Sequence, residues 1–218
     1  MRTTRVFIIH PQRLVCVALR DLMEKFGDLM VVGVSCDFAG AQAALADGTI
    51  DVFLMADRLE DCTGVSALKR IRQDHLHTKV VFYRLGGASP LFDYMATRYG
   101  AGAVLPASCG YSELVAAVRG VHEGTLEPMQ SRMAGRARKL SAREMDVLAG
   151  ILEGKSLGET AEELGISDKT VSTYKNRLFH KLGVKSAVEL VGMYNCGNGV
   201  GSLFQCSLTF RLFLCGGG

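Results

Sequence analysis

Five short apolar runs, each followed by a segment with helical spacing, constrain the first 123 residues more than any other feature of this sequence. The runs are apolar throughout and do not alternate with polar residues, which is typical of strands buried on both faces of a parallel sheet. Five strand–helix units of this length predict a doubly wound α/β domain. The predicted strands are Arg5–Ile9, Leu29–Val34, Val52–Met55, Lys79–Tyr83 and Ala103–Leu105, and the predicted helices are Pro11–Phe26, Phe38–Ala46, Val65–Ile71, Leu91–Thr97 and Tyr111–His122.

In open sheets of this kind, the working crevice lies outside the carboxyl ends of the strands. The residues that follow the predicted strands are therefore the first candidates for a functional site. They combine a histidine, an aspartate and an arginine with small or apolar residues, and they are His10, Ala56, Asp57, Arg84, Pro106 and Ala107.

The C-terminal part has a different pattern. Residues 139–195 have the spacing of four consecutive helices, two of which are opened by serine followed three residues later by glutamate, as in a capping box. Residues 124–138 lack such a pattern and are predicted to be a linker. The helix boundaries are the N-caps Ser141, Ser156 and Ser167, the C-caps Gly165 and Gly183, and the last helix Ser186–Tyr194.

The formal charge of +3 is unevenly divided along the chain. Residues 1–130 hold 13 lysines and arginines against 14 acids, whereas residues 131–218 hold 12 against 8. Most of the excess comes from two acid-free stretches, 132–143 and 169–185, with five basic residues each. A basic half beside a near-neutral half favours a polyanionic partner for the basic half.

Several classes of protein are excluded by the composition. No apolar run is long enough for a transmembrane helix, and the four apolar residues before His10 are too few for a signal peptide, so we expect a soluble, cytoplasmic protein. Seven cysteines without CxxC spacing or close histidine pairing predict reduced thiols, with no metal and no cofactor. The sequence shows no nucleophile–base pair of an enzyme.

Two parts of the chain resemble a known family. The stretch Leu140–Val191 resembles the LuxR-type helix-turn-helix in its helix lengths, in the position of Glu144, and in the segments ETAEELGIS and TVSTYKNRLFHKLGV. The upstream part resembles the receiver domain of NarL/FixJ-type response regulators in architecture and in the segments DVFLMADRLEDCTGV and GAGAVLPAS. The resemblance implies a receiver-like domain at 1–123, a linker at 124–138, a DNA-binding domain at 139–195, and a tail at 196–218 that has no counterpart in the family.

The third C-terminal helix is amphipathic. At 100° per residue, Tyr174, Leu178 and Leu182 fall within about 60° of Val171. The opposite face carries no acid and mixes hydroxyl, amide and cationic groups, as a helix in the major groove of double-stranded DNA requires. The resemblance implies base contacts by Ser172, Thr173 and Asn176, and phosphate contacts by Lys169, Thr170, Tyr174, Lys175, Arg177 and Lys181.

The receiver-like part lacks the groups that carry phosphorylation in this family. An active receiver has a phosphoacceptor aspartate after the third strand, and Mg²⁺ needs hard oxygen ligands from it and from an acidic pair. Alignment on Asp51 and Gly64 places Ala56 at the aspartate position. The sequence therefore predicts a pseudo-receiver. The other altered positions are His10 and Pro11 for the acidic pair, Arg84 for the threonine or serine after the fourth strand, and Pro106 or Ala107 for the lysine after the fifth.

Two features of this crevice leave alternatives open. Asp57 is the other candidate phosphoacceptor, although its side chain points to the opposite side if the strand continues. Arg84, near His10 and Arg58, either binds an anion or pairs with Asp57 and mimics an activated state without phosphate.

The predicted function is a sequence-specific, DNA-binding transcriptional regulator that acts without conventional aspartyl phosphorylation. One short recognition helix contacts few bases, so we expect a homodimer, and the resemblance implies dimer contacts at Ala187, Val188 and Val191. The alternatives are a regulatory partner that heterodimerises with another response regulator, and a regulator phosphorylated at Asp57. The apolar tail is consistent with a cap on the helical core, an interface or a segment without function.

Overall fold

The computed structural model describes residues 3–46, 48–75, 77–84, 86–87, 89–126 and 140–195. The chain divides into two compact units, Met1–Arg84 with Pro90–Gly135, and Leu85–Ser89 with Arg136–Gly218. The predicted linker lies outside the described residues beyond Leu126, and the predicted tail lies outside them entirely.

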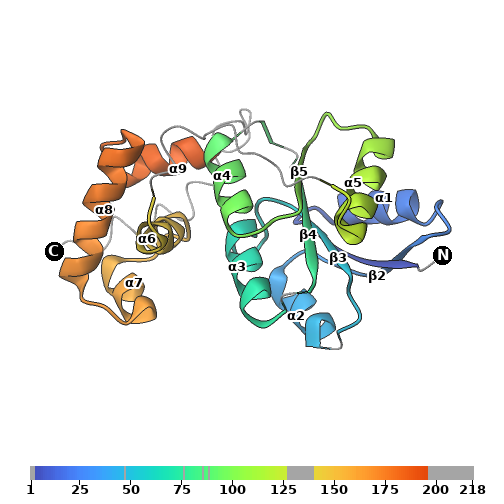
Figure 1. Cartoon of the computed structure of the whole chain (residues 1–218), viewed down its shortest axis with the longest axis horizontal. Coiled ribbons are helices and arrows are strands. Elements are labelled where there is room, and N and C mark those ends of the chain that lie inside the picture. The colour runs from blue at the N-terminus through green and yellow to red at the C-terminus, as the bar shows by residue number, and fades with distance from the viewer. Residues whose placement is uncertain are drawn as a thin grey trace. The chain divides into compact units, whose positions relative to one another are not determined.

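Among the described residues, a parallel sheet with the strand order β2-β1-β3-β4-β5 forms the centre of the first unit (Figure 1). Because the chain order reverses between β1 and β3, the sheet is doubly wound, and the predicted α/β class is confirmed. The strands are β1 (Thr4–Ile9), β2 (Leu29–Ser35), β3 (Val52–Met55), β4 (Lys79–Arg84) and β5 (Ala103–Pro106), and the helices are α1 (Arg13–Met23), α2 (Phe38–Ala46), α3 (Gly64–Asp74), α4 (Pro90–Arg98) and α5 (Tyr111–Glu123).

Helices cover both faces of the sheet, which explains the unbroken apolar runs in its strands (Figure 1). On one face, Val6, Leu54 and Val81 are packed with side chains of α1 and α5. On the other face, the rings of Phe82 in β4 and Phe92 in α4 lie 4.9 Å apart in an edge-to-face contact. Fully burying a side chain of this size contributes about 1.5–3 kcal/mol, so the two layers provide much of the unit's stability.

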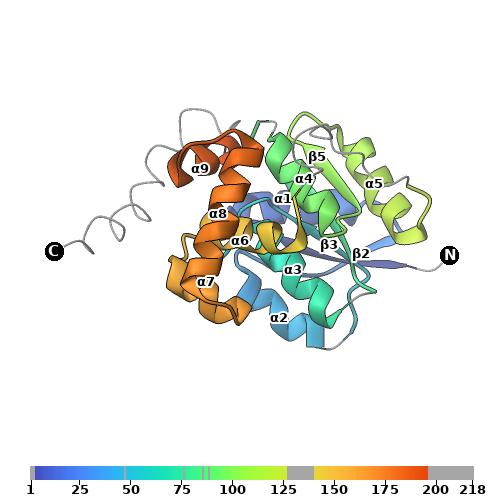
Figure 2. The ribbon, with the colours of Figure 1, turned by 60° about the vertical axis from the view of Figure 1, so that its left-hand side comes forward.

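Within the second unit, residues 140–195 form four helices, as predicted. Helix α8 packs on both α6 and α7 (Figure 2). Ser141 and Ser156 both form capping boxes, and the left-handed C-cap Gly165 (φ 64°) ends α7, so these three predicted boundaries are confirmed. The helices are α6 (Ala142–Leu152), α7 (Leu157–Leu164), α8 (Asp168–Leu182) and α9 (Ala187–Asn195).

Within the described ranges, no helix combines the length and the apolar character needed to cross a membrane.

Candidate functional site

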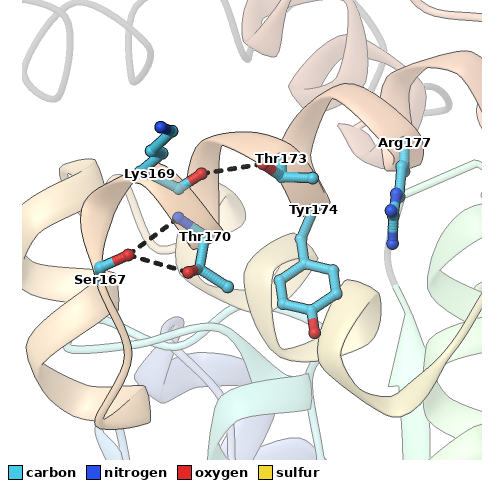
Figure 3. A pocket seen from close by; sticks show the side chains of 6 residues that line it. All are labelled: Ser167, Lys169, Thr170, Thr173, Tyr174 and Arg177. Atoms are coloured by element: carbon cyan, nitrogen blue, oxygen red, sulfur yellow. Dashed lines mark hydrogen bonds between the residues drawn. The ribbon is translucent and has the colours of Figure 1, made fainter.

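Helix α8 begins at a firmly capped turn. The Ser167 hydroxyl accepts a hydrogen bond from the Thr170 backbone N–H at 3.2 Å, and it lies 2.8 Å from the Thr170 hydroxyl (Figure 3). Asp168 in the first turn is favourable beside the positive end of the helix dipole. These contacts satisfy backbone groups at the N-terminus of α8 and hold its first turn in helical geometry.

The face of α8 that packs against the other helices is the face that the sequence predicted to be buried. Val171, Leu178 and Leu182 are buried. Tyr174 is half-buried and packs against a cluster that includes Val171 and Ala161. Because this face is fixed in the helical unit, the opposite face must point to solvent.

The outer face of α8 carries most of the residues expected to contact DNA. Thr173, Asn176 and Arg177 are exposed, and Ser172 and Lys175 are half-buried. Among the described residues, the side chains of Ser172 and Asn176 have no hydrogen-bond partner, so both can form bonds to a ligand. A shallow depression of about 380 Å³ without acidic groups lies along this helix, lined by Ser167, Lys169, Thr170, Thr173, Tyr174 and Arg177 (Figure 3).

The strands of the first unit bring the predicted crevice residues to one edge of the sheet. Ile9 pairs with Met55, and Met55 pairs with Phe82, so the residues after β1 and β3 lie beside the end of β4. His10 and Ala56 are each 3% exposed. The other predicted positions are the half-buried Pro11, the buried Arg84 at the end of β4, and the exposed Pro106 and Ala107.

Arg84 is the buried centre of an ionic cluster in this crevice. Its Nε donates to Asp57 Oδ2 at 3.1 Å, and its Nη1 lies 3.5 Å from Asp93 Oδ1 in α4. The guanidinium carbon lies 4.9 Å from the centre of the Phe92 ring. The Arg84 side chain is only 5% exposed, so its charge is compensated mainly by these protein groups.

Asp57 occupies this position because β3 ends at Met55. The alternation of an extended strand therefore does not apply to Asp57, and its carboxylate turns toward Arg84. In the described residues, no three histidine, cysteine, aspartate or glutamate side chains are grouped as a metal site requires.

Comparison with known proteins places both units in one family. Residues 138–194 match the family described as "Bacterial regulatory proteins, luxR family". The Salmonella typhimurium "Transcriptional regulatory protein UhpA" is 30% identical over 189 residues, which cover 85% of this chain and 94% of that protein. The chain belongs to the NarL/FixJ family of response regulators.

Other relatives agree with this NarL/FixJ assignment. "Response regulator UvrY" of Escherichia coli is 26% identical over 200 residues, covering 85% of this chain and 90% of the relative. RcsB from Salmonella enterica serovar Typhimurium, solved "bound to promoter rprA in the presence of phosphomimetic BeF3-", has a TM-score of 0.68 at 20% identity. That match covers 88% of this chain and 98% of RcsB, and it supports the fold.

Lys181 of this NarL/FixJ protein forms a contact that the sequence did not predict. Its ammonium donates to Glu144 Oε2 at 2.7 Å, and the Glu144 side chain is 3% exposed. Burial opposes ionisation of Glu144, but hydrogen bonds from Lys181 and from Ser141 outweigh it and hold the pKa of Glu144 below its usual range. Lys181 therefore joins α8 to the capping box of α6.

Replacing Lys181 by methionine is expected to lower the free energy of unfolding of the helical unit by about 1 kcal/mol, because the lysine is partly exposed. Amide hydrogen exchange in α6 and α8 would measure this, with the exposed Lys185→Met as control. The salt dependence of DNA binding is expected to stay unchanged. A weaker salt dependence at unchanged stability would instead make Lys181 a phosphate contact.

The surroundings of His10 are expected to make the stability of the first unit depend on pH. Burial lowers the pKa of His10, and the nearby Asp57 carboxylate opposes this only in part. His10 Nδ1 accepts a hydrogen bond from the Gln12 backbone N–H at 3.1 Å, which requires this nitrogen to be unprotonated. Below about pH 6.5 the unfolded chain binds a proton that the folded unit resists, so acid favours unfolding.

We therefore expect the stability of the first unit to fall as the pH drops below about 6.5, with His10 contributing at most about 1.4 kcal/mol per pH unit. His10→Gln should flatten this part of the profile, whereas His77→Gln, which changes an exposed histidine, should not. Denaturant unfolding between pH 5 and 8 measures it. Equal profiles for wild type and His10→Gln would contradict the assignment.

Two contacts of this family member could be found only in the structure. Asp93 and Phe92, which surround Arg84, lie on α4 and carry no motif that links them to the end of β4. The N-terminus of α2 is held by Asp61, whose carboxylate accepts the backbone N–H groups of Phe38 and Ala39. The sequence does show that Asp61 is an acidic residue after a strand. It does not show its partners, because the backbone N–H groups of α2 that it binds lie more than 20 residues away.

Proposed function

We propose that this NarL/FixJ-type chain is a sequence-specific, DNA-binding transcriptional regulator that acts without phosphorylation of an aspartate. The observation that carries the DNA-binding part is the outer face of α8, an acid-free surface on a helix whose opposite face is buried. An α-helix fits the major groove of double-stranded DNA, where its side chains meet the base edges. The net charge of +4 over residues 131–218 favours the same partner.

We assign reading of the bases and anchoring of the phosphates to different residues of α8. Ser172, Thr173 and Asn176 read bases. Lys181 is left out of the phosphate set because Glu144 binds its ammonium. The proposed phosphate contacts are Lys169, Thr170, Tyr174, Lys175 and Arg177.

The proposed DNA-bound form is a homodimer. A single α8 covers too few base pairs for selective binding, and RcsB, a structural neighbour, has been solved as "two RcsB dimers bound to two parallel DNAs". On α9, Val188 is 61% exposed, and it lies between the half-buried Ala187 and Val191 in the sequence, so together they offer apolar surface. We propose these three residues as the dimer contact.

The contacts of Arg84 support the phosphorylation-independent part of the proposal. Ala56 offers no group that could accept a phosphoryl group. Two carboxylates already neutralise Arg84, which favours an internal pair over the alternative of an anion-binding site. Asp57 is engaged in this cluster, and Mg²⁺ would find neither of the acids that the family places after β1. We propose domain boundaries of 1–123 for the pseudo-receiver and 139–195 for the DNA-binding domain.

Selection of binding sequences from a random duplex library by the full-length protein tests this function. We expect enrichment of a two-fold symmetric sequence whose half-sites are about one helical turn apart. Failure to enrich any sequence would overturn the proposal. Co-purification from native extract, with and without nuclease, tests the heterodimer alternative, and recovery of a second response regulator in place of a homodimer would favour that alternative.

A further inference from the structure

Thr173 is an exposed residue on the outer face of α8, and its hydroxyl already forms a hydrogen bond within the helix. Its Oγ1 donates a hydrogen bond to the carbonyl oxygen of Lys169, one turn earlier, at 2.9 Å. A hydroxyl has a single proton, so Oγ1 has none left to donate to a base. Figure 3 shows the hydroxyl turned back toward Lys169 and the methyl carbon directed away from it.

The other two proposed base contacts present different chemistry. The Ser172 hydroxyl and the Asn176 amide have no hydrogen-bond partner among the described residues, so each can donate as well as accept. An asparagine amide can form two hydrogen bonds with adenine. Thr173 differs because its hydroxyl is bound to the Lys169 carbonyl, which leaves its methyl group as the part of the side chain that can meet a base.

A methyl group on an exposed residue of a recognition helix fits one feature of the major groove, the C5-methyl group of thymine. Contact between the two methyl groups removes apolar surface of both from water. We propose that Thr173 is a specificity-determining residue that selects thymine through its Cγ2 methyl group and not through its hydroxyl. This inference rests on the proposed DNA-binding function and names the base that one position of α8 reads.

The test uses the full-length protein and its selected operator, in which each thymine is replaced in turn by deoxyuridine. This replacement removes only the C5-methyl group. We expect one thymine per half-site at which it weakens binding by about fourfold, the value of one buried methyl group. Replacing both symmetry-related thymines should weaken binding by about fifteenfold if the half-sites are independent.

Substitutions at Thr173 assign that effect to this side chain. Thr173→Ser removes the methyl group and keeps the hydroxyl, so it should abolish the difference between thymine and deoxyuridine. Thr173→Val keeps a methyl group and should keep the difference. Thr97→Ser is the matched control, because the Thr97 hydroxyl also donates to a carbonyl one turn earlier, that of Asp93 at 2.7 Å, in α4 of the other unit. It should behave like wild type.

Three results overturn the inference. The first is equal binding of the thymine and deoxyuridine operators at every position, and the second is a persistent difference in Thr173→Ser. The third is a base preference at that position that Thr173→Val abolishes while deoxyuridine has no effect, because then Oγ1 reads the base. If the protein selects no operator at all, the proposed function fails together with this inference. If an operator is selected but one of the three results is found, only the inference fails.

Discussion

Replacing Arg84 by methionine is expected to lower the free energy of unfolding of the first unit by about 3–5 kcal/mol. The Arg84 side chain is 5% exposed, and its removal leaves the carboxylates of Asp57 and Asp93 without their shared cation in a crevice where they are 19% and 25% exposed. Such a loss is a large part of a typical domain's stability. The reason is the loss of the guanidinium charge, because methionine preserves most of the side chain's volume.

Amide hydrogen exchange in β4 and α4 of the full-length protein would measure this loss within the affected unit. Asp57→Asn should cost less than Arg84→Met, because Asp93 still pairs with Arg84. Arg98→Met, which changes an exposed arginine at the end of α4, is the matched control and should stay within about 0.5 kcal/mol of wild type. If Arg84→Met has no larger effect than this control, the cluster does not stabilise the crevice, and an anionic ligand of Arg84 becomes the better account.

Replacing Asn176 by alanine is expected to relax the choice of operator, at a cost of about 1–3 kcal/mol for the base pair that the amide reads. Asn176 is exposed on α8, and its amide has no partner among the described residues, so its removal should cost little stability. The loss should appear for one base pair in each half-site. Other sequences should bind about as before.

Lys175→Ala should give the opposite pattern, because a phosphate contact carries no sequence information. It should weaken binding to all duplexes and reduce the slope of log affinity against log salt by about one. Binding titrations on matched and mismatched operators at several salt concentrations distinguish the two patterns. Lys25→Ala removes the same charge from an exposed position in the first unit and should change neither quantity. Unchanged binding in both Asn176→Ala and Lys175→Ala would contradict the proposed docking of α8.

The fold could be predicted from the sequence because its signals are local. Unbroken apolar runs indicated buried parallel strands, and Ser141, Ser156 and Gly165 marked helix ends through hydrogen bonds to neighbouring residues. For Arg84, the sequence left two interpretations open, an anion-binding site and a pair with Asp57. The pair could be foreseen because the ends of the parallel strands β3 and β4 lie at one edge of the sheet.

The remaining contacts depend on side-chain directions that periodicity does not specify. Asp93 reaches Arg84 only because of how α4 returns across the sheet. The resemblance implied a phosphate contact for Lys181, but the buried Glu144 carboxylate lies within reach of its ammonium. The angle of α8 to α6 decides this contact, and it is set by the packing of the whole helical unit.

Above all, we propose that this NarL/FixJ protein binds its operator without an aspartyl phosphate. The most direct measurement is the affinity of the full-length protein for the selected operator before and after incubation with a small phosphodonor and Mg²⁺, with the intact mass recorded on the same samples. We predict tight binding before treatment, the same affinity after it, and no gain in mass. A mass gain of one phosphoryl group that maps to Asp57 and strengthens binding would contradict the account.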